Sequence, residues 1–235
     1  MIDIRIADIN IRMHNRFSYI EAMSHGYTAE FESADIEVET NDRDIDEEIK
    51  NTEFPTEPPY AEAACLHREI AERLWRYDAF LLHSALIECD GAGYAFAARS
   101  GVGKSTHIGL WQKVFGDRVC IVNGDKPIIK LTEKGIVAYG TPWNGKEGYG
   151  ENRGCPLKAL CFLERGDENV IEPISPEEAV ARLFPQVYLP ADAQAVSRTL
   201  DLLDEFVRKI SFFRLFCNME EEAAQVAHGA MSQTD

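Results

Sequence analysis

The stretch AARSGVGKSTHIGLW, residues 97–111, indicates the fold more strongly than any other part of the sequence. It follows an apolar run and nearly matches the phosphate-binding pattern G-x-x-x-x-G-K-[ST]. Gly103, Lys104 and Ser105 fit this pattern, whereas Ala98 stands where the first glycine is expected. Because that position falls at the end of a predicted strand, a Cβ there need not point at phosphate. The stretch therefore predicts a working phosphate site between a strand and a helix.

Each part of this stretch has a role in binding phosphate. Successive backbone N–H groups, together with the positive end of the following helix, surround the phosphates. The lysine adds a positive charge, and the serine after it offers a hydroxyl to magnesium. The predicted nucleotide-binding residues are Ser100, Gly101, Val102, Gly103, Lys104, Ser105 and Thr106.

Composition excludes several classes of partner. The chain of 235 residues carries 24 basic and 40 acidic side chains, a net charge of −16, and a field of that sign repels nucleic-acid backbones. The sequence contains no run of about 18 apolar residues, so we expect no membrane span. The N-terminus, MIDIRIADIN, has no signal-peptide pattern, so we expect a cytoplasmic protein. The six cysteines and six histidines show no metal-ligand spacing, and we expect reduced core cysteines.

The N-terminal section differs from the rest in charge. Residues 2–12 and 34–39 alternate loosely and predict strands. Between residues 30 and 57 there are twelve acidic residues and only two basic ones, which is typical of a solvated loop or strand face, with a docking surface for a basic peptide as the alternative. The proline-rich FPTEPPY then predicts a boundary, giving an accessory section over 1–57 and a nucleotide-binding core over 58–235.

The core has the pattern of a mixed α/β domain. AFLLHSALIEC (79–89) predicts one strand, and a turn at Asp90 and Gly91 joins it to GYAFAA, so the two strands must be antiparallel. Further strands are predicted over 119–123, 127–131, 136–140, 157–164 and in ISFFRLF, and helices over 104–113, after the capping box at Ser175, around 196–207 and over 218–230.

These motifs, taken in order, resemble a known family. HSALIE, SGVGKSTHIGLW, VCIVNGDKPII and TPWNG resemble segments of the HPr kinase/phosphorylase catalytic domain and of phosphoenolpyruvate carboxykinase, and more closely the small HPr-kinase-like proteins of bacterial peptide-modification clusters. The resemblance covers residues 81–165. It implies a phosphoenolpyruvate carboxykinase/HPr kinase-like mixed sheet and phosphoryl transfer that depends on ATP and Mg²⁺. It is also compatible with a homo-oligomer.

Carried over by position, the resemblance implies a set of site residues. Lys104 would hold the phosphates, Ser105 and Asp125 would hold magnesium, and Asp125 would also accept the proton of the attacking hydroxyl. His83 would stand beside the phosphates, or would be an ordinary buried polar residue on a strand. HPr kinases carry two adjacent aspartates where this chain has Gly124 and Asp125, so one carboxylate must do both tasks or the base comes from elsewhere.

The segment TPWNGKEGYGENRG, residues 141–154, is the other candidate. Its glycines and charges suit a mobile flap that carries Lys146 or Arg153 onto the transferring phosphate, or else an ordinary surface loop. Trp143 would stack on a base or anchor the loop. The predicted catalytic residues are therefore Asp125, His83, Lys104 and Arg153.

We expect a kinase that phosphorylates a hydroxyl, with a serine of a peptide or protein as the preferred acceptor. A nucleotide-binding regulator without turnover is the alternative, and a carboxykinase-type enzyme acting on a small acid is the second.

Overall fold

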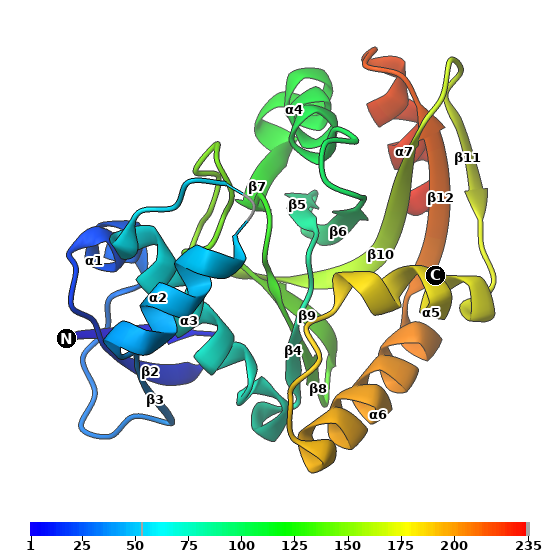
Figure 1. The fold of residues 1–235 in the computed structure, drawn as a ribbon. Helices are drawn as coiled ribbons and strands as arrows, with labels where there is room; N and C mark the ends of the chain where they lie inside the picture. Colours follow the sequence, from blue (N-terminus) through cyan, green and yellow to red (C-terminus); the bar gives the residue numbers. More distant parts are fainter. Residues whose placement is uncertain (53, 234–235) are drawn as a thin grey trace.

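Two β-sheets organise the chain. The computed structural model describes residues 1–52 and 54–233, so Glu53 of the acidic stretch and the last two residues of the predicted core lie outside it. In the described residues, a three-stranded sheet lies at the N-terminal end, and a nine-stranded mixed sheet forms the centre of the rest (Figure 1). Helices pack against both sheets. The prediction of a mixed α/β fold is confirmed at this level.

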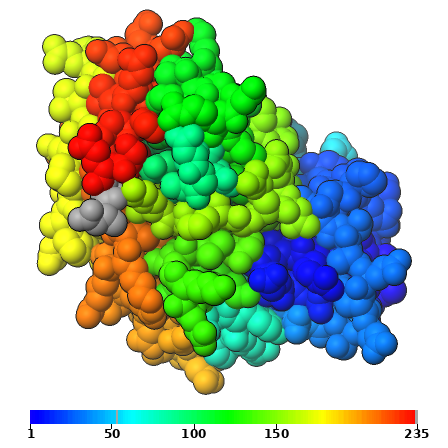
Figure 2. All heavy atoms as spheres, turned by 180° about the vertical axis from the view of Figure 1, so that it is seen from behind, coloured from blue at the N-terminus to red at the C-terminus, as the bar shows by residue number. Residues whose placement is uncertain are grey.

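The N-terminal sheet begins with a hairpin. Its strands are β1 (Ile2–Ile6), β2 (Ile9–His14) and β3 (Ile36–Glu39). The single strand predicted over 2–12 was wrong, because Ala7 and Asp8 adopt left-handed backbone angles, φ 54° and 60°, and reverse the chain. β2 pairs antiparallel with β1 and parallel with β3. Figure 2 shows this section, in blue, at one side of the molecule.

Much of the acidic stretch is helical. α2 (Asp42–Asn51) begins with a capping box, in which the Asn41 side chain accepts the N–H of Asp44 and the Asp44 carboxylate accepts the N–H of Asn41. The expectation of a loop or strand face was wrong here. The pattern was missed because α2 buries little: Ile45 lies in the core, and the charged residues around it face solvent.

The helix α3 (Pro58–Ala71) joins the N-terminal sheet to the rest. Leu66 and Ile70 pack in one hydrophobic cluster with the N-terminal strands, and the same cluster takes in Ile128 and Trp143 of the core. The helix therefore belongs by packing to the N-terminal sheet, although it follows the proline-rich segment. The division after residue 57 stays a prediction.

The large sheet is built around one long strand. Its strands are β4 (Ala79–Leu81), β5 (Ala85–Cys89), β6 (Ala92–Ala97), β7 (Val119–Asn123), β8 (Ile128–Thr132), β9 (Gly135–Tyr139), β10 (Gly154–Arg165), β11 (Val170–Pro173) and β12 (Ser211–Cys217). They follow the order β4-β8-β9-β10-β6-β5-β7, with β12 beside β10 and β11 beside β12. β10 runs parallel to β6 and β12 and antiparallel to β9.

The predicted strand over 79–89 is two strands that pair with different partners. β4 pairs with β8, whereas β5 pairs with β6 and β7. At the break, the N–H of His83 donates to the Gln186 carbonyl at 2.7 Å, and the N–H of Ser84 donates to the Asp125 carbonyl at 3.0 Å. The break therefore places His83 next to Asp125. The predicted hairpin at Asp90 and Gly91 is confirmed.

Helices cover both faces of the large sheet. The remaining α-helices are α1 (Tyr19–Met23), α4 (Lys104–Phe115), α5 (Pro176–Leu183), α6 (Ala193–Lys209) and α7 (Glu222–Met231), and short 3-10 turns are η1 (His25–Tyr27), η2 (Leu74–Tyr77), η3 (Gly116–Arg118) and η4 (Phe184–Gln186). α4 and α7 pack on one face and α5 and α6 on the other (Figure 1). In the described part of the chain, no helix combines the length and apolarity needed to cross a membrane.

Candidate functional site

A glycine loop, residues 98–103, connects β6 to α4. Gly101 and Gly103 have φ angles of 78° and 121°, in the region that L side chains rarely adopt. A Cβ on Gly101 would meet no atom within 4 Å, so its glycine is needed for backbone conformation and leaves open space beside the loop. Ala98 is 6% exposed and packs in the cluster of Phe96 and Trp111, so its Cβ points into the core.

Lys104 begins α4 and directs its ammonium group toward two other predicted site residues. Its Nζ lies 2.9 Å from His83 Nε2 and 4.0 Å from Asp125 Oδ1. Its side chain is only 10% exposed. Burial lowers the pKa of Lys104, because the charged form loses solvation, although the Asp125 charge opposes this effect.

The turn after β7 sets the position of Asp125. The side-chain oxygen of Asn123 accepts the N–H groups of Asp125 at 2.9 Å and Lys126 at 2.7 Å, while its amide group donates to the carbonyl and hydroxyl oxygens of Thr141. Asn123 is fully buried. The sequence signal was an Asn-Gly-Asp turn, whose asparagine side chain commonly bonds to the backbone two residues on.

Asp125 stands among three basic side chains. Its Oδ1 lies 3.0 Å from His83 Nε2, and its Oδ2 lies 3.3 Å from Lys126 Nζ. Burial raises the pKa of this carboxyl, but the hydrogen bond with His83 and the charges of Lys126, His83 and Lys104 outweigh it and lower the pKa to about 2. Asp125 is therefore an ionised carboxylate at neutral pH.

His83 cannot satisfy both of its neighbours. Its Nε2 faces the Lys104 ammonium and the Asp125 carboxylate, yet one ring nitrogen either donates or accepts a hydrogen bond. If Nε2 accepts from Lys104, its lone pair also faces a carboxylate oxygen. If it carries a proton toward Asp125, that N–H faces an ammonium group. A ligand that draws Lys104 away would remove this conflict.

A side chain at Gly124 would collide with the loop over 141–154. A Cβ at this position would lie 2.4 Å from the Asn144 carbonyl oxygen, and the Gly124 N–H donates to the Tyr149 carbonyl at 2.8 Å. The segment 144–149 therefore lies directly against the Gly124 backbone. An aspartate would require that segment to move.

The loop over 141–154 is anchored at both ends. The N–H of Gly140 donates to the Arg153 carbonyl, and the N–H of Glu151 donates to the Val122 carbonyl, both at 3.0 Å. The Arg153 guanidinium lies 2.5 Å from Glu88 Oε2 and 3.9 Å from Glu151. Of the predicted catalytic residues, the structure thus brings His83, Lys104 and Asp125 together and holds Arg153 at Glu88.

His67 was not singled out from sequence, whereas Trp143, on which it stacks, was. His67, on α3, stacks on Trp143 with ring centroids 4.6 Å apart, and its buried Nε2 has no hydrogen-bond partner in the part of the chain that the structure describes. Burial, and then the charge of Lys126, lowers the pKa of His67 to about 3, so the ring is neutral. Trp143 donates its Nε1–H to the Ala63 carbonyl at 3.0 Å, which makes it an anchor of the loop.

The donor set suits magnesium. Ser105 offers a hydroxyl from the first turn of α4 and Asp125 a carboxylate, and Mg²⁺ prefers such oxygen ligands together with waters and substrate phosphates. The two residues predicted as metal ligands therefore fit this ion in chemical type.

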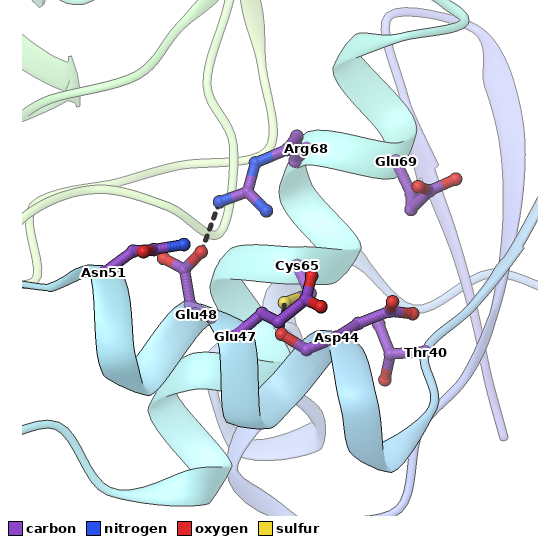
Figure 3. A pocket seen from close by; sticks show the side chains of 8 residues that line it. All are labelled: Thr40, Asp44, Glu47, Glu48, Asn51, Cys65, Arg68 and Glu69. Carbon is purple, nitrogen blue, oxygen red and sulfur yellow. Dashed lines mark hydrogen bonds and ion pairs between the residues drawn. The ribbon is translucent and has the colours of Figure 1, made fainter.

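In two other clusters of polar side chains, the carboxylates already have partners within the protein. A hollow of about 260 Å³ lies between α2 and α3, where Arg68 pairs with Glu48 (Figure 3). The other carboxylates lining it are also engaged, Glu47 by Arg43, Glu69 by Arg73 and Asp44 by the helix cap. Cys89, Asp90 and His228 come within 4.8 Å of one another, but Arg118 binds both carboxylate oxygens of Asp90, at 3.0 and 2.5 Å.

Comparison with known proteins leaves the family open. No family model matches the chain, and no curated protein matches its sequence. Among solved structures, the Hpr(Ser) kinase/phosphatase from Coxiella burnetii matches with 13% sequence identity over 55% of this chain and 88% of that one, with a TM-score of 0.27. Agreement of that size does not assign the chain to a family.

Proposed function

We propose that the protein is an ATP- and magnesium-dependent kinase that transfers the γ-phosphoryl group to a hydroxyl, with a serine of a peptide or protein as the preferred acceptor. The observation that carries this proposal is the meeting of Lys104, His83 and Asp125, within 4.0 Å of one another, beside a glycine loop that opens a helix. Phosphoryl transfer needs a phosphate cradle, a cation and a group that aligns the hydroxyl, and these residues match those needs.

Each residue has a role in this proposal. The backbone N–H groups over 100–106 and the N-terminus of α4 bind the phosphates, and Lys104 neutralises their charge. Ser105 and Asp125 would hold Mg²⁺, which supplies charge stabilisation on the transferring group when bound. The Asp125 carboxylate accepts the hydroxyl proton. Once phosphate draws Lys104 away, His83 donates to Asp125 and fixes its orientation.

A second function is supported by the same geometry. One carboxylate serves where the family pattern has two, and Lys126 is already within 3.3 Å of it. A nucleotide-binding regulator without turnover would also have this arrangement, since ATP binding needs the glycine loop and Lys104 only. Turnover separates the two functions.

Binding is tested first. We expect Lys104→Ala to weaken Mg-ATP binding at least tenfold, about 1.4 kcal/mol, in calorimetric titration. Lys113→Ala is the matched control, because Lys113 lies on the same helix and its side chain is 68% exposed. Equal affinities of wild type and Lys104→Ala would remove the nucleotide site from the proposal.

Turnover is tested next. We expect Asp125→Asn to lower phosphate transfer by a factor of about 10² or more, because the proton acceptor is lost, while ATP binding persists. Asp117→Asn, on the exposed η3 turn, is the control. Transfer is measured with serine-containing peptides at saturating magnesium. A wild type that binds ATP without consuming it would favour the regulator.

A further inference from the structure

A group of metal-binding side chains lies at the far end of α4 from the glycine loop. Cys89 is the last residue of β5, Asp90 begins the turn to β6, and His228 lies on the last helix, α7. The thiol sulfur, a carboxylate oxygen and a ring nitrogen of these residues lie within 4.8 Å of one another. Sequence spacing did not reveal the group, because the histidine is distant from the other two residues along the chain.

The three residues stand on well-packed backbone. Cys89 belongs to the paired part of the β5–β6 hairpin, and the Asp90 N–H donates to the Arg118 carbonyl at 3.3 Å. The His228 ring packs on Phe115, the last residue of α4, with ring centroids 4.7 Å apart. Donors that are already held in place lose little conformational freedom when a cation binds, which favours binding.

The donor set is the one that zinc prefers. Zn²⁺ binds thiolate sulfur, imidazole nitrogen and carboxylate oxygen in tetrahedral sites, whereas Mg²⁺ and Ca²⁺ take oxygen ligands. Tetrahedral zinc separates a sulfur ligand from an oxygen ligand by about 3.5 Å. The Cys89 sulfur lies 3.8 Å from Asp90 Oδ2. Within the described residues, no hydrogen bond occupies the ring nitrogens of His228.

Arg118 competes with a cation for this site. Its Nε and Nη2 donate to the two carboxylate oxygens of Asp90, at 3.0 and 2.5 Å. Both side chains are 51% exposed, and exposed ion pairs of this kind contribute little free energy. Zinc held by several protein ligands binds far more strongly than such a pair. The guanidinium also lies over the Phe115 ring, 5.4 Å from its centroid, a contact that it can keep.

We propose that Cys89, Asp90 and His228 bind a divalent cation of the zinc type, which replaces Arg118 at the Asp90 carboxylate. The Cys89 thiol gives up its proton on binding, and water takes the fourth position. The 12 residues of α4 span about 18 Å, so the site is separate from Lys104 and independent of the proposed kinase function. The cation ties α7 to the β5–β6 turn.

The binding experiment titrates Co²⁺ and then Zn²⁺ into reduced, chelator-treated protein without an affinity tag. We expect Co²⁺ to produce the near-ultraviolet charge-transfer band of a cobalt–thiolate bond, Zn²⁺ to displace it, and a hundredfold excess of Mg²⁺ to leave it unchanged. Cys89→Ser should lose the band, and Asp90→Asn and His228→Gln should weaken Zn²⁺ binding at least tenfold. Cys217→Ser, at a half-buried cysteine of β12, is the matched control and should keep the band.

The competition is tested with Arg118→Gln, which should bind Zn²⁺ at least threefold more tightly than wild type, because the guanidinium no longer holds Asp90. At a hundredfold excess over its Kd, Zn²⁺ should raise the midpoint of thermal unfolding of wild type by about 5 °C or more, and should leave that of His228→Gln unchanged.

Three results would overturn the inference: a cobalt band that survives in Cys89→Ser, wild-type Zn²⁺ affinity in both Asp90→Asn and His228→Gln, or no gain of affinity in Arg118→Gln. Asp90 is exposed and His228 half-buried, so their variants decide the question if the change at buried Cys89 prevents folding.

Discussion

Two glycines near Asp125, Gly101 of the glycine loop and Gly124, are needed for opposite reasons. In the glycine loop, a Cβ on Gly101 would meet no atom within 4 Å, and the residue is needed for its left-handed backbone. At Gly124, which faces the loop over 141–154, a Cβ would lie 2.4 Å from the Asn144 carbonyl. The space beside Gly101 is open, whereas the space beside Gly124 is filled by the backbone of the loop over 141–154.

A glycine in a sequence can therefore mark either a backbone conformation or a close contact. The sequence alone does not distinguish Gly101 from Gly124, yet a Cβ on the first would meet open space and a Cβ on the second would overlap backbone. A neutral histidine lies beside each: His107, buried behind the glycine loop, and His67, partly buried against Trp143. Four predictions test this contrast, in order of decreasing effect.

The largest effect concerns the histidine behind the glycine loop. His107 is 3% exposed and accepts the Trp111 Nε1–H at 3.1 Å, and burial lowers its pKa from 6.5 to about 4. Between pH 6.5 and pH 4, the unfolded chain therefore binds a proton at this histidine that the folded chain does not. The contribution of His107 to the free energy of unfolding is fully present above pH 6.5 and is lost as the pH falls toward 4. We expect His107→Gln to remove about 3 kcal/mol of this pH dependence between pH 7 and pH 4.

Urea unfolding at several pH values measures this slope. His25→Gln, at an exposed position, is the control and should keep the wild-type slope. If His107→Gln and wild type lose stability equally on acidification, the helix behind the glycine loop is not held by a neutral histidine.

The second prediction tests the close packing of the loop over 141–154 against Gly124. We expect Gly124→Ala to lower the free energy of unfolding by about 2 kcal/mol, because the new methyl overlaps the Asn144 carbonyl. Gly109→Ala, on α4 with no atom within 4 Å of its Cβ, should stabilise the protein slightly. Thermal or urea unfolding compares the two. If Gly124→Ala leaves the free energy of unfolding unchanged, the loop over 141–154 can move to accept the methyl group.

The third prediction tests the open loop and rests on the proposed nucleotide site. We expect Gly101→Ala to weaken Mg-ATP binding at least tenfold, about 1.4 kcal/mol, because an L residue disfavours the φ of 78° that the loop needs. Calorimetric titration measures the change. If the affinity for Mg-ATP is unchanged, the left-handed backbone at Gly101 is not needed for binding.

The smallest effect is expected at Ala98. Its Cβ packs in the core with Phe96 and Trp111, so Ala98→Gly should change ATP affinity less than threefold, under about 0.7 kcal/mol. The same titration measures it. A large gain in affinity would indicate that the alanine had impaired the loop.

Strong local signals made much of the fold predictable from sequence. The strand before the glycine loop is buried on both faces and reads as an apolar run, α4 follows a glycine, and Ser175 caps α5. Helix α2 was missed because Ile45 is the one residue that it buries. The chain break at His83 was missed because only tertiary pairing, with β8 on one side and β6 on the other, divides the strand.

The residues of the candidate site that belong to a sequence motif were predictable. Lys104 and Asp125 came from ordered motifs, and their closeness follows from strands ending at one edge. Lys126 follows Asp125 in the same motif, and its closeness to the carboxylate was expected. His67 could not be found in this way, because a histidine on an apolar helix carries no pattern of its own. Arg153 has a partner, Glu88, that no local spacing reveals.

The anchoring of Trp143 has a consequence for the way the molecule comes apart. Its ring packs in the cluster that contains β1, β2, β3 and α3, and its indole N–H bonds to α3. A chain cut after residue 57 would leave Leu66, Ile70 and Ile128 with an uncovered apolar surface. We therefore expect the N-terminal section and the loop beside Asp125 to unfold together, so that a ligand bound to the first would also stabilise the second.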